Sequence, residues 1–184
     1  MALLETPLKD ETFVAKPFNL LGTDDQHHSL DSLRGENGTV IFFICNHCPY
    51  VKAIIDRLVE DAKTLQDEGF GVVAIMPNDT QNYPADSFDN MKIFADEHKF
   101  NFPYLIDETQ QTAKDYGAIC TPDIYGFNSE DKLEYRGRLD SAGKDEANTD
   151  TQKELLEAMK EIAQSGQSSA TQFPSMGCSI KCKE

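Results

Sequence analysis

The chain has 184 residues, of which 39% are hydrophobic, and its formal net charge is −15 at pH 7. A chain of this length and composition can bury a core without disulfide staples, which excludes a disordered protein and a disulfide-framework protein. The excess of acidic residues excludes nucleic acid and an anionic membrane as partners, because both require clustered lysine and arginine.

The predicted elements alternate between buried strands and amphipathic helices, followed by a hairpin and a closing helix. The strands have short apolar, β-rich runs, and the helices have apolar residues at helical spacing. In chain order they are a strand at 38–44, a helix at 49–69, a strand at 71–77, a helix at 88–95, a strand at 102–107, a helix at 108–117, hairpin strands at 123–128 and 132–139, and a helix at 150–166.

This order predicts an α/β fold, in which a central mixed sheet is covered by helices on both faces. We expect one domain over residues 1–165, with an N-terminal extension before the first long strand. Residues 166–184 are rich in Ser, Gln and Gly, which predicts a flexible C-terminal tail. The polar loop at 78–87 has no predicted element, and Asp86 or Ser87 is a candidate cap for the helix that follows.

Cysteine usage and hydropathy limit the chemistry and the location. No stretch approaches the roughly 18 apolar residues that would span a bilayer, and the N-terminal segment lacks the basic-then-apolar order of a signal peptide. We therefore expect a cytoplasmic protein. An odd number of cysteines favours thiol chemistry or metal binding over a structural disulfide network. The five cysteines are Cys45, Cys48, Cys120, Cys178 and Cys182.

Two of these cysteines lie where the first long strand runs into the first long helix, in "FFICNHCPYVKA" (residues 42–53). Pro49 is favoured in a first helical turn, so unpaired amides and the positive end of the helix dipole surround this segment. That position lowers the pKa of a thiol, and the spacing of Cys45 and Cys48 suits a disulfide. His47 can hydrogen-bond to the thiolate and stabilise the reduced pair. We predict a redox dithiol in which Cys45 attacks, Cys48 resolves and His47 tunes the thiolate.

This segment, together with its strand–helix order and the later "CTPDIYGFN", resembles the thioredoxin superfamily. The run from Phe18 to Gly35 narrows the resemblance to its AhpC/TSA, peroxiredoxin-like branch, over about residues 12–165. Within that branch, "NHCPYVKA" and the ending "MGCSIKCKE" resemble a group whose key cysteine is the first of the pair. The resemblance implies a thioredoxin-like fold and a thiol–disulfide oxidoreductase that needs no cofactor.

The resemblance also implies a substrate-binding edge at Thr121 and Pro122. In thioredoxin-like proteins the proline at this place is cis and faces the dithiol. Pro122 is therefore expected to lie against Cys45, with the Thr121 backbone free to pair with an extended substrate segment.

Departures from the peroxiredoxin pattern make peroxide reduction an alternative rather than the first choice. Ile41 and Cys45 stand where peroxiredoxins place the proline and the threonine that orient peroxide. Arg136 and Arg138, in the predicted hairpin, can still supply a cation to the site.

The remaining cysteines each have two interpretations. Cys178 is a candidate resolving thiol if the tail folds back, or else an incidental thiol of a mobile end. Cys120, beside the expected cis proline, can exchange with Cys45 or be a small buried residue. Cys182 is the weaker candidate of the two tail cysteines.

Two rival functions remain open from the sequence. The pair, His47 and the tail cysteines offer soft ligands for Zn²⁺ or Cu⁺, although a metal site is not our first choice. A redox-inactive binding module of the same fold would contain an unreactive Cys45. For the oxidoreductase, the expected partners are a protein or small-molecule disulfide, or alternatively a peroxide, and a thiol reductant whose identity the sequence does not specify. The sequence makes no prediction of oligomeric state.

Overall fold

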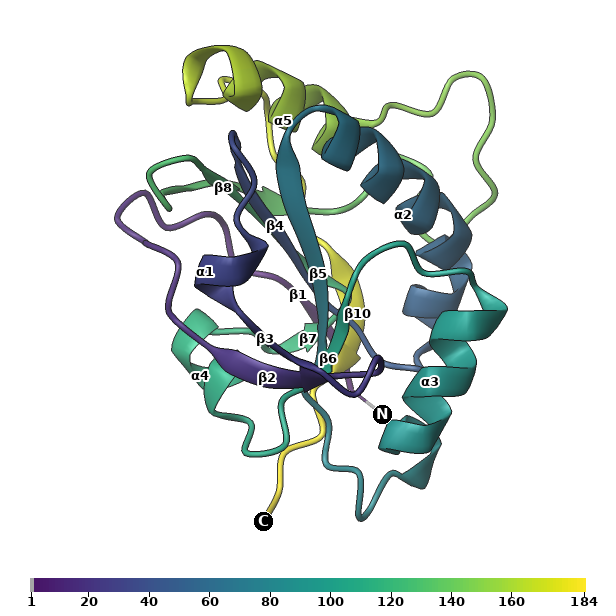
Figure 1. Ribbon diagram of the computed structural model, residues 1–184. Helices are drawn as coiled ribbons and strands as arrows, with labels where there is room; N and C mark the ends of the chain where they lie inside the picture. Colours follow the sequence, from purple (N-terminus) through teal and green to yellow (C-terminus); the bar gives the residue numbers. More distant parts are fainter. Residues whose placement is uncertain (1) are drawn as a thin grey trace.

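The computed structural model describes residues 2–184 (Figure 1). The helical elements are α1 Leu30–Leu33, α2 Pro49–Asp67, the 3-10 helix η1 Pro84–Asp86, α3 Phe88–Glu97, α4 Gln111–Tyr116 and α5 Glu154–Ser165. The strands are β1 Leu3–Glu5, β2 Asn19–Gly22, β3 His27–Ser29, β4 Gly38–Phe43, β5 Phe70–Met76, β6 Tyr104–Ile106, β7 Cys120–Thr121, β8 Asp123–Asn128, β9 Leu133–Gly137 and β10 Met176–Ser179.

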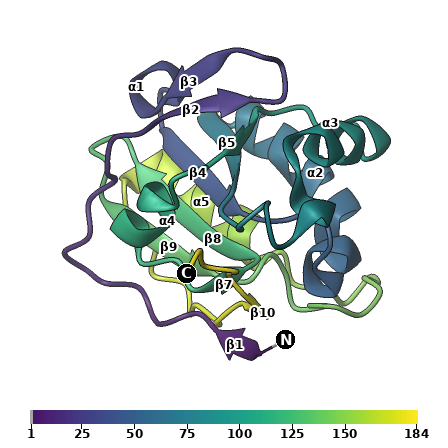
Figure 2. The ribbon, with the colours of Figure 1, turned by 90° about the horizontal axis from the view of Figure 1, so that it is seen from below.

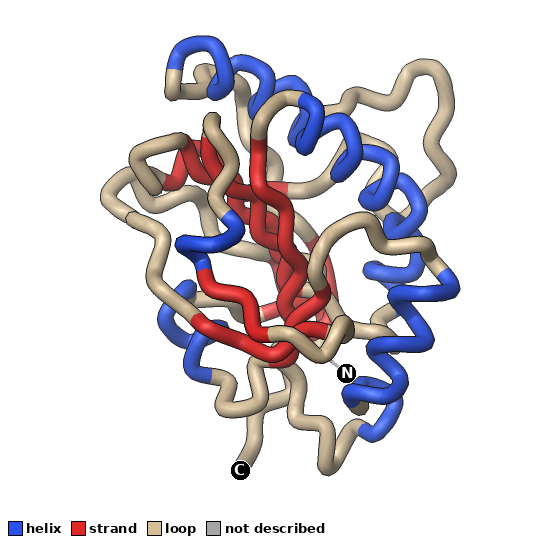
Figure 3. The backbone as a smooth tube through the Cα atoms, viewed as in Figure 1, coloured by secondary structure: helices blue, strands red, loops and turns tan. Residues whose placement is uncertain are grey.

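The central sheet is mixed, as predicted. Its strands follow the orders β3-β2-β6-β5 and β4-β8-β9. β5 and β6 are parallel, whereas β8 is antiparallel to both β4 and β9. β4 lies beside β5 (Figures 1 and 3), where the N–H of Ile44 donates to the carbonyl oxygen of Ile75 at 3.0 Å.

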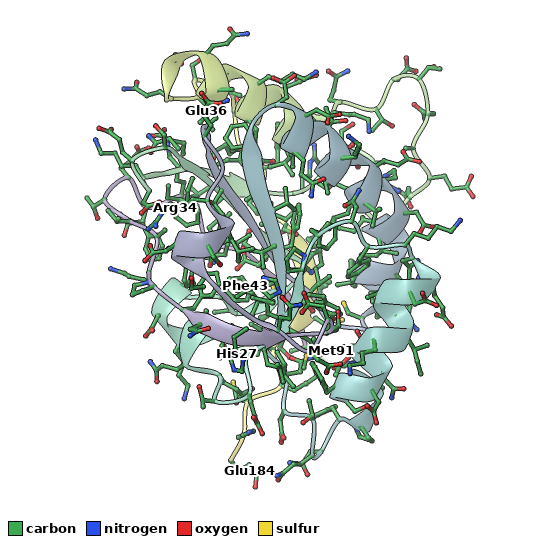
Figure 4. The ribbon with its side chains drawn as sticks, in the orientation of Figure 1. His27, Arg34, Glu36, Phe43, Met91 and Glu184 are labelled. Carbon is green, nitrogen blue, oxygen red and sulfur yellow. The ribbon has the colours of Figure 1, made fainter. Side chains whose placement is uncertain are left out.

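Helices cover both faces of this sheet, which confirms the predicted layers. α2, α3 and α5 lie on one face, and α1 and α4 on the other (Figure 1). β4 shows the cause: Val40 and Phe42 pack into the first layer and Ile41 and Phe43 into the second, because successive strand side chains point to opposite faces. Phe43 and Met91, both labelled in Figure 4, belong to opposite layers.

α2 is the long helix that the sequence predicts after the two cysteines. Pro49 occupies its first turn, and its buried stripe repeats at helical spacing from Val51 to Leu65. The helix ends before Gly69, whose φ of +87° favours glycine. Its other face is polar, and no helix among residues 2–184 is long and apolar enough to cross a membrane.

The C-terminal segment differs from the flexible tail predicted for residues 166–184. β10 lies between β1 and β7 in a small antiparallel sheet (Figure 2). Gly177 permits the close approach, because a Cβ there would lie 1.9 Å from the carbonyl oxygen of Thr121. The tail has the composition of a flexible chain. The backbone of β10, however, is hydrogen-bonded to a strand on each side, and this pairing holds it in place.

Candidate active site

Cys45 and Cys48 lie at the junction of β4 and α2, where the sequence places them. Cys48 is the N-cap residue of α2, and Pro49 follows it in the first turn. Both are free thiols, with exposed fractions of 1% for Cys45 and 0% for Cys48. The pair therefore lies beneath the surface at the positive end of a 19-residue helix.

A cis peptide bond joins Thr121 to Pro122, as the resemblance implies. The hydroxyl oxygen of Thr121 lies 3.4 Å from the sulfur of Cys45, and its carbonyl oxygen lies 3.2 Å from the sulfur of Cys48. Thr121 therefore contacts both members of the dithiol, although it lies far from them in the sequence.

The backbone of Thr121 is not free to pair with a substrate, in contrast to the expectation from the resemblance. β10 already occupies this edge, and Cys178 is the residue directly opposite Thr121. Directly opposed residues of an antiparallel pair project their side chains from the same face of the sheet. The side chain of Cys178 therefore lies on the face where Thr121 contacts the dithiol, and three cysteines meet around Thr121.

The sulfur of Cys48 is the one that ionises most readily. A hydrogen bond from the Cys45 thiol lowers the pKa of Cys48 to about 5, and the side chain and backbone N–H of Cys178 act in the same direction. The Val51 amide also lowers this pKa, although it makes no short capping hydrogen bond.

Two features oppose that ionisation. Burial favours the neutral thiol, and the carbonyl oxygen of Thr121 accepts a hydrogen bond from Cys48 only while Cys48 is protonated. The hydrogen-bond donors outweigh these effects, because a thiolate gains charge-assisted bonds from each of them.

Cys45 has the opposite tendency. Its hydrogen bond to Cys48, followed by burial and by the negative charge of Asp86, raises the pKa of Cys45 well above its usual range. The sequence predicts that Cys45 attacks, but the electrostatics of the pair favour a thiolate on Cys48 and a proton on Cys45.

We expect reduced protein to show the ultraviolet absorbance of a thiolate with a midpoint near the pKa of about 5 for Cys48. Cys48→Ser should remove this low-pH transition. Cys178→Ala should move it upward, because the substitution removes the thiol donor that helps to lower this pKa and leaves only the backbone N–H of residue 178. A titration in which Cys45→Ser, and not Cys48→Ser, removes the transition would contradict this assignment.

His47 lies beside the dithiol, but its nearest polar partner is Asp86. The Nδ1 atom of His47 lies 2.6 Å from an Asp86 carboxylate oxygen, and its ring stacks on Tyr83 with centroids 6.2 Å apart. The Asp86 carboxylate is fully buried and accepts hydrogen bonds from the Asn46 backbone at 2.8 Å and the Asn78 side chain at 2.9 Å. Asp86 therefore holds the loop between the two cysteines.

Asp86 is the site residue that the sequence did not reveal. Of the two candidate caps predicted for α3, Ser87 takes that role, because its hydroxyl accepts the Asn90 N–H. The available signal was the polar loop at 78–87, which had no predicted element of its own. The tertiary fold brings this loop against the residues that follow β4.

One group of three candidate metal ligands occurs among residues 2–184. It consists of Cys45, His47 and Asp86, whose ligand atoms lie within 4.8 Å of one another. Sulfur, imidazole and carboxylate are all ligands that Zn²⁺ accepts. This set differs from the one that the sequence offered, because it contains Asp86 and lacks the tail cysteines. Cys182 is exposed, and its sulfur lies 3.9 Å from the carbonyl oxygen of Ile180.

The two arginines expected to supply a cation are committed to carboxylates. Arg136 is paired with the buried Asp123 at 2.8 Å, and Arg138 is paired with Glu154 at 2.6 Å. These ion pairs neutralise both guanidinium groups in structural roles, so neither supplies a free charge to the dithiol.

Cys120 has the second of its two interpretations, that of a buried residue. It precedes Thr121 in β7, so its side chain projects from the opposite face. Burial raises the pKa of Cys120 to about 12, which keeps the thiol protonated at neutral pH.

A cavity of about 380 Å³ reaches the neighbours of Thr121 and Cys178 in the chain, although none of the cysteines lines it. Its walls include Pro122, which follows Thr121, and Met176, which lies two residues before Cys178. The rest of its wall is largely apolar at Tyr50 and Leu139, and its charged residues are Arg138, Asp140 and Lys144. The cavity suits a small molecule that has an apolar body.

A comparison with protein families matches the model described as "AhpC/TSA family" to residues 13–136, a range that includes Cys45, Cys48 and Thr121. No curated protein matches the chain.

Two solved structures match the chain over nearly its full length. An "uncharacterized conserved protein" from Geobacillus kaustophilus is 40% identical, with 100% of this chain and 97% of that chain covered and a TM-score of 0.93. A hypothetical protein from Sinorhizobium meliloti is 31% identical, with 97% of each chain covered and a TM-score of 0.89.

A more distant match concerns the fold alone. The thioredoxin domain of a thiol-disulfide oxidoreductase from Bacteroides vulgatus is 16% identical, with 70% of this chain and 89% of that chain covered and a TM-score of 0.59. The match confirms the thioredoxin-like fold expected from the sequence.

Proposed function

The chain belongs to the AhpC/TSA family of the thioredoxin superfamily, and from that premise we propose that it is a thiol–disulfide oxidoreductase whose redox pair is Cys45 and Cys48. The observation that carries the proposal is the contact of both sulfurs with Thr121, at the N-terminus of α2. The lowered pKa of Cys48 supports it, because the thiolate is the form that attacks a disulfide.

The reaction proceeds in two exchanges. The Cys48 thiolate attacks a substrate disulfide, forms a mixed disulfide and releases the first substrate thiolate. The Cys45 sulfur then attacks the sulfur of Cys48 and releases the second substrate thiolate, which takes up the Cys45 proton. The substrate disulfide is reduced to two thiols, and the pair is oxidised to Cys45–Cys48. Two external thiols then reduce the Cys45–Cys48 bond to the dithiol through two further exchanges and are themselves oxidised to a disulfide.

The neighbouring residues position this pair. Asp86 holds the loop between the cysteines. The His47 ring is paired with Asp86 and has a nitrogen within 4.8 Å of the Cys45 sulfur. Thr121 and Pro122 form the substrate side of the site, since Thr121 contacts both sulfurs and Pro122 lines the adjacent cavity.

The experiment that tests the function is intact-mass thiol mapping of the whole protein across a graded glutathione redox buffer. We expect a reversible disulfide between Cys45 and Cys48, because their spacing and burial suit one. The absence of any cysteine pairing at every potential, or stoichiometric zinc in dialysed protein, would contradict the oxidoreductase. Cys182→Ser serves as a control, because Cys182 is exposed and outside the cluster.

Peroxide reduction is the second candidate, favoured by the family and by a low-pKa thiolate at a helix N-cap. The Cys48 thiolate would attack one peroxide oxygen, break the O–O bond and release hydroxide or alkoxide, which takes up a proton. The resulting sulfenic acid would then react with the Cys45 thiol to give the disulfide and water. Comparing the rate constants for hydrogen peroxide and for a small disulfide distinguishes the two activities. Cys45 occupies the place where peroxiredoxins use a threonine hydroxyl, so we expect the disulfide to react faster.

A further inference from the structure

β10 binds to β7 in the manner in which an extended substrate would. Cys178 pairs with Thr121, Ser179 pairs with Cys120, and the Ile180 N–H donates to the Ile119 carbonyl oxygen at 2.9 Å. The strand is antiparallel to β7 and is the middle strand of the small sheet, with β1 on its other side. A cysteine of the same chain therefore stands where a substrate cysteine would face the dithiol.

Side chains on both ends of β10 hold it in this place. Before the strand, the Ser175 hydroxyl donates to the Pro122 carbonyl oxygen at 2.8 Å. After it, the Lys181 N–H donates to the Asn78 side chain at 2.9 Å, and Asn78 in turn donates to Asp86. The strand is thus anchored to the same Asp86 that holds the loop between the redox cysteines.

The three sulfurs form one closed cluster with Cys48 at its centre. Cys48 interacts with Cys45 on one side and with the side chain of Cys178 on the other. The exposed fractions of all three residues are 4% or less, so β10 shields the dithiol from solvent. Burial and the neighbouring Cys48 raise the pKa of Cys178 to about 11. Once Cys48 enters a mixed disulfide its charge is gone, and the sulfur of Cys178 then faces a neutral, electrophilic partner.

We propose that β10 is an intramolecular disulfide partner: Cys178 forms a disulfide with Cys48, and the strand that carries it restricts the external substrate to low-molecular-weight disulfides. The proposal rests on the proposed function and deepens it by naming a third redox thiol and a substrate class.

The exchange balances without a further reagent. A small disulfide accepts the Cys48 thiolate, which yields a mixed disulfide and one free thiolate. The Cys178 sulfur then attacks the sulfur of Cys48 and releases the second substrate thiolate, which receives the proton of Cys178. Two protein thiols are oxidised to the Cys48–Cys178 bond as one substrate disulfide is reduced. Cys45 can later displace Cys178 from Cys48, which gives the Cys45–Cys48 bond.

The substrate class follows from which surfaces are open. The edge of β7 is taken by β10, so an extended polypeptide has no backbone to pair with unless β10 leaves. The adjacent cavity is open to a small molecule and lies next to Thr121 and β10 through Pro122 and Met176. Its wall is apolar at Tyr50 and Leu139. Its charged residues Arg138 and Asp140 are paired with Glu154 and Arg57, so Lys144 is the cation that remains for a carboxylate. A small disulfide that bears a carboxylate suits this wall, and oxidised lipoate is a suitable probe.

The first test maps disulfides in Cys45→Ser after treatment with oxidised lipoate. We expect a Cys48–Cys178 bond as the main product, because Cys178 is then the remaining cysteine in the cluster. If wild-type protein forms Cys45–Cys48 but Cys45→Ser forms no Cys48–Cys178, the inference fails and the proposed function stands. If wild-type protein forms no disulfide at all, the proposed function fails as well.

The second test loosens the strand without removing its cysteine. In Gly177→Ala the new Cβ meets the Thr121 carbonyl oxygen at 1.9 Å, so β10 must move away from β7. We expect the yield of Cys48–Cys178 in a Cys45→Ser background to fall roughly tenfold or more, since overpacking of this kind displaces backbone. We also expect the reduction of insulin to rise relative to that of oxidised lipoate.

Cys182→Ser is the matched control in the same segment, because it changes an exposed thiol outside the strand. It should leave both the disulfide map and the ratio of the two substrates unchanged. An equal preference for insulin and lipoate in wild-type protein, or a Gly177→Ala protein that keeps wild-type values for yield and ratio, would overturn the proposal. Circular dichroism of Gly177→Ala verifies that the domain remains folded. If this variant does not fold, the disulfide map of Cys45→Ser from the first test decides whether Cys48 and Cys178 pair.

Discussion

Replacing Cys48 with serine is expected to lower the rate of disulfide exchange by about 10³-fold or more, the scale of losing a nucleophile. Cys48 is the sulfur with the lowered pKa, and it contacts both Cys45 and Cys178. Without Cys48, neither Cys45 nor Cys178 has the sulfur with which it would form a disulfide. Cys45→Ser should retain part of the activity, about one-tenth to one-hundredth of wild type, because Cys178 can still resolve the mixed disulfide. The measurement is the rate of oxidised lipoate reduction by excess dithiothreitol for each variant.

Cys182→Ser provides the reference for a thiol lost outside the cluster and should behave as wild type. Two results would overturn the assignment of roles. Cys45→Ser could lose as much activity as Cys48→Ser, which would return the attack to Cys45 as the sequence predicts. Cys48→Ser could retain full exchange, which would remove the dithiol from the reaction altogether.

Arg136→Met is expected to lower the free energy of unfolding at neutral pH by about 3–5 kcal/mol, the cost of leaving one partner of a buried ion pair alone. The Asp123 carboxylate is fully buried, and Arg136 reaches it with two nitrogens at 3.2 and 2.8 Å. The guanidinium also lies over the ring of Tyr125 at 4.6 Å. Urea unfolding curves of the two proteins give the difference. A loss below about 1 kcal/mol would show that water or relaxation solvates Asp123.

The same change has a defined pH dependence. Burial raises the pKa of Asp123, and Arg136 opposes that rise. Removing Arg136 therefore moves the folded pKa further above the unfolded value of about 3.9. At pH values between the unfolded and the folded pKa of Asp123, the folded state binds a proton that the unfolded state lacks, so the free energy of unfolding falls as the pH increases. We expect the loss in Arg136→Met to be smallest in acid and to grow towards neutral pH.

Lys63→Met is the matched control for an exposed ion pair. Lys63 and Asp67 lie 2.6 Å apart with 64% of each side chain exposed, and such pairs contribute about 0–1 kcal/mol. A second variant, Arg136→Met with Asp123→Leu, should recover part of the loss, because it removes both buried charges together. If the double variant is no more stable than the single one, packing of Arg136 on Tyr125 rather than charge explains the effect.

The regular part of the fold was predictable from local pattern. β4 and α2 match the predicted strand at 38–44 and helix at 49–69 closely. Both elements could be predicted because the apolar run of the strand and the helical spacing of buried residues are visible within a few neighbouring residues. The short strands β1, β2, β3, β7 and β10 were not predicted. They contain between 2 and 4 residues, and pairing with partners distant in sequence stabilises them rather than their own pattern.

The candidate site divides in the same way. The position of Cys45 and Cys48 at a strand–helix junction could be predicted, since a proline and an apolar stripe mark the helix start. Asp86 could not, because its burial depends on a loop folding against Asn46 and Asn78. The two arginines looked available in the sequence, but charges alone do not reveal which carboxylates will face them.

The sequence by itself determined the layered α/β fold and the place of Cys45 and Cys48 at a helix N-terminus. These are local properties, because periodicity and capping depend on residues within a few positions of one another. Only the tertiary structure decided which thiol has its pKa lowered, which carboxylate holds the loop, and that Cys178 faces Cys48 from β10. Those properties depend on distances between segments far apart in the chain, and the electrostatics of a buried thiol change with each donor or charge that folding brings within a few ångströms.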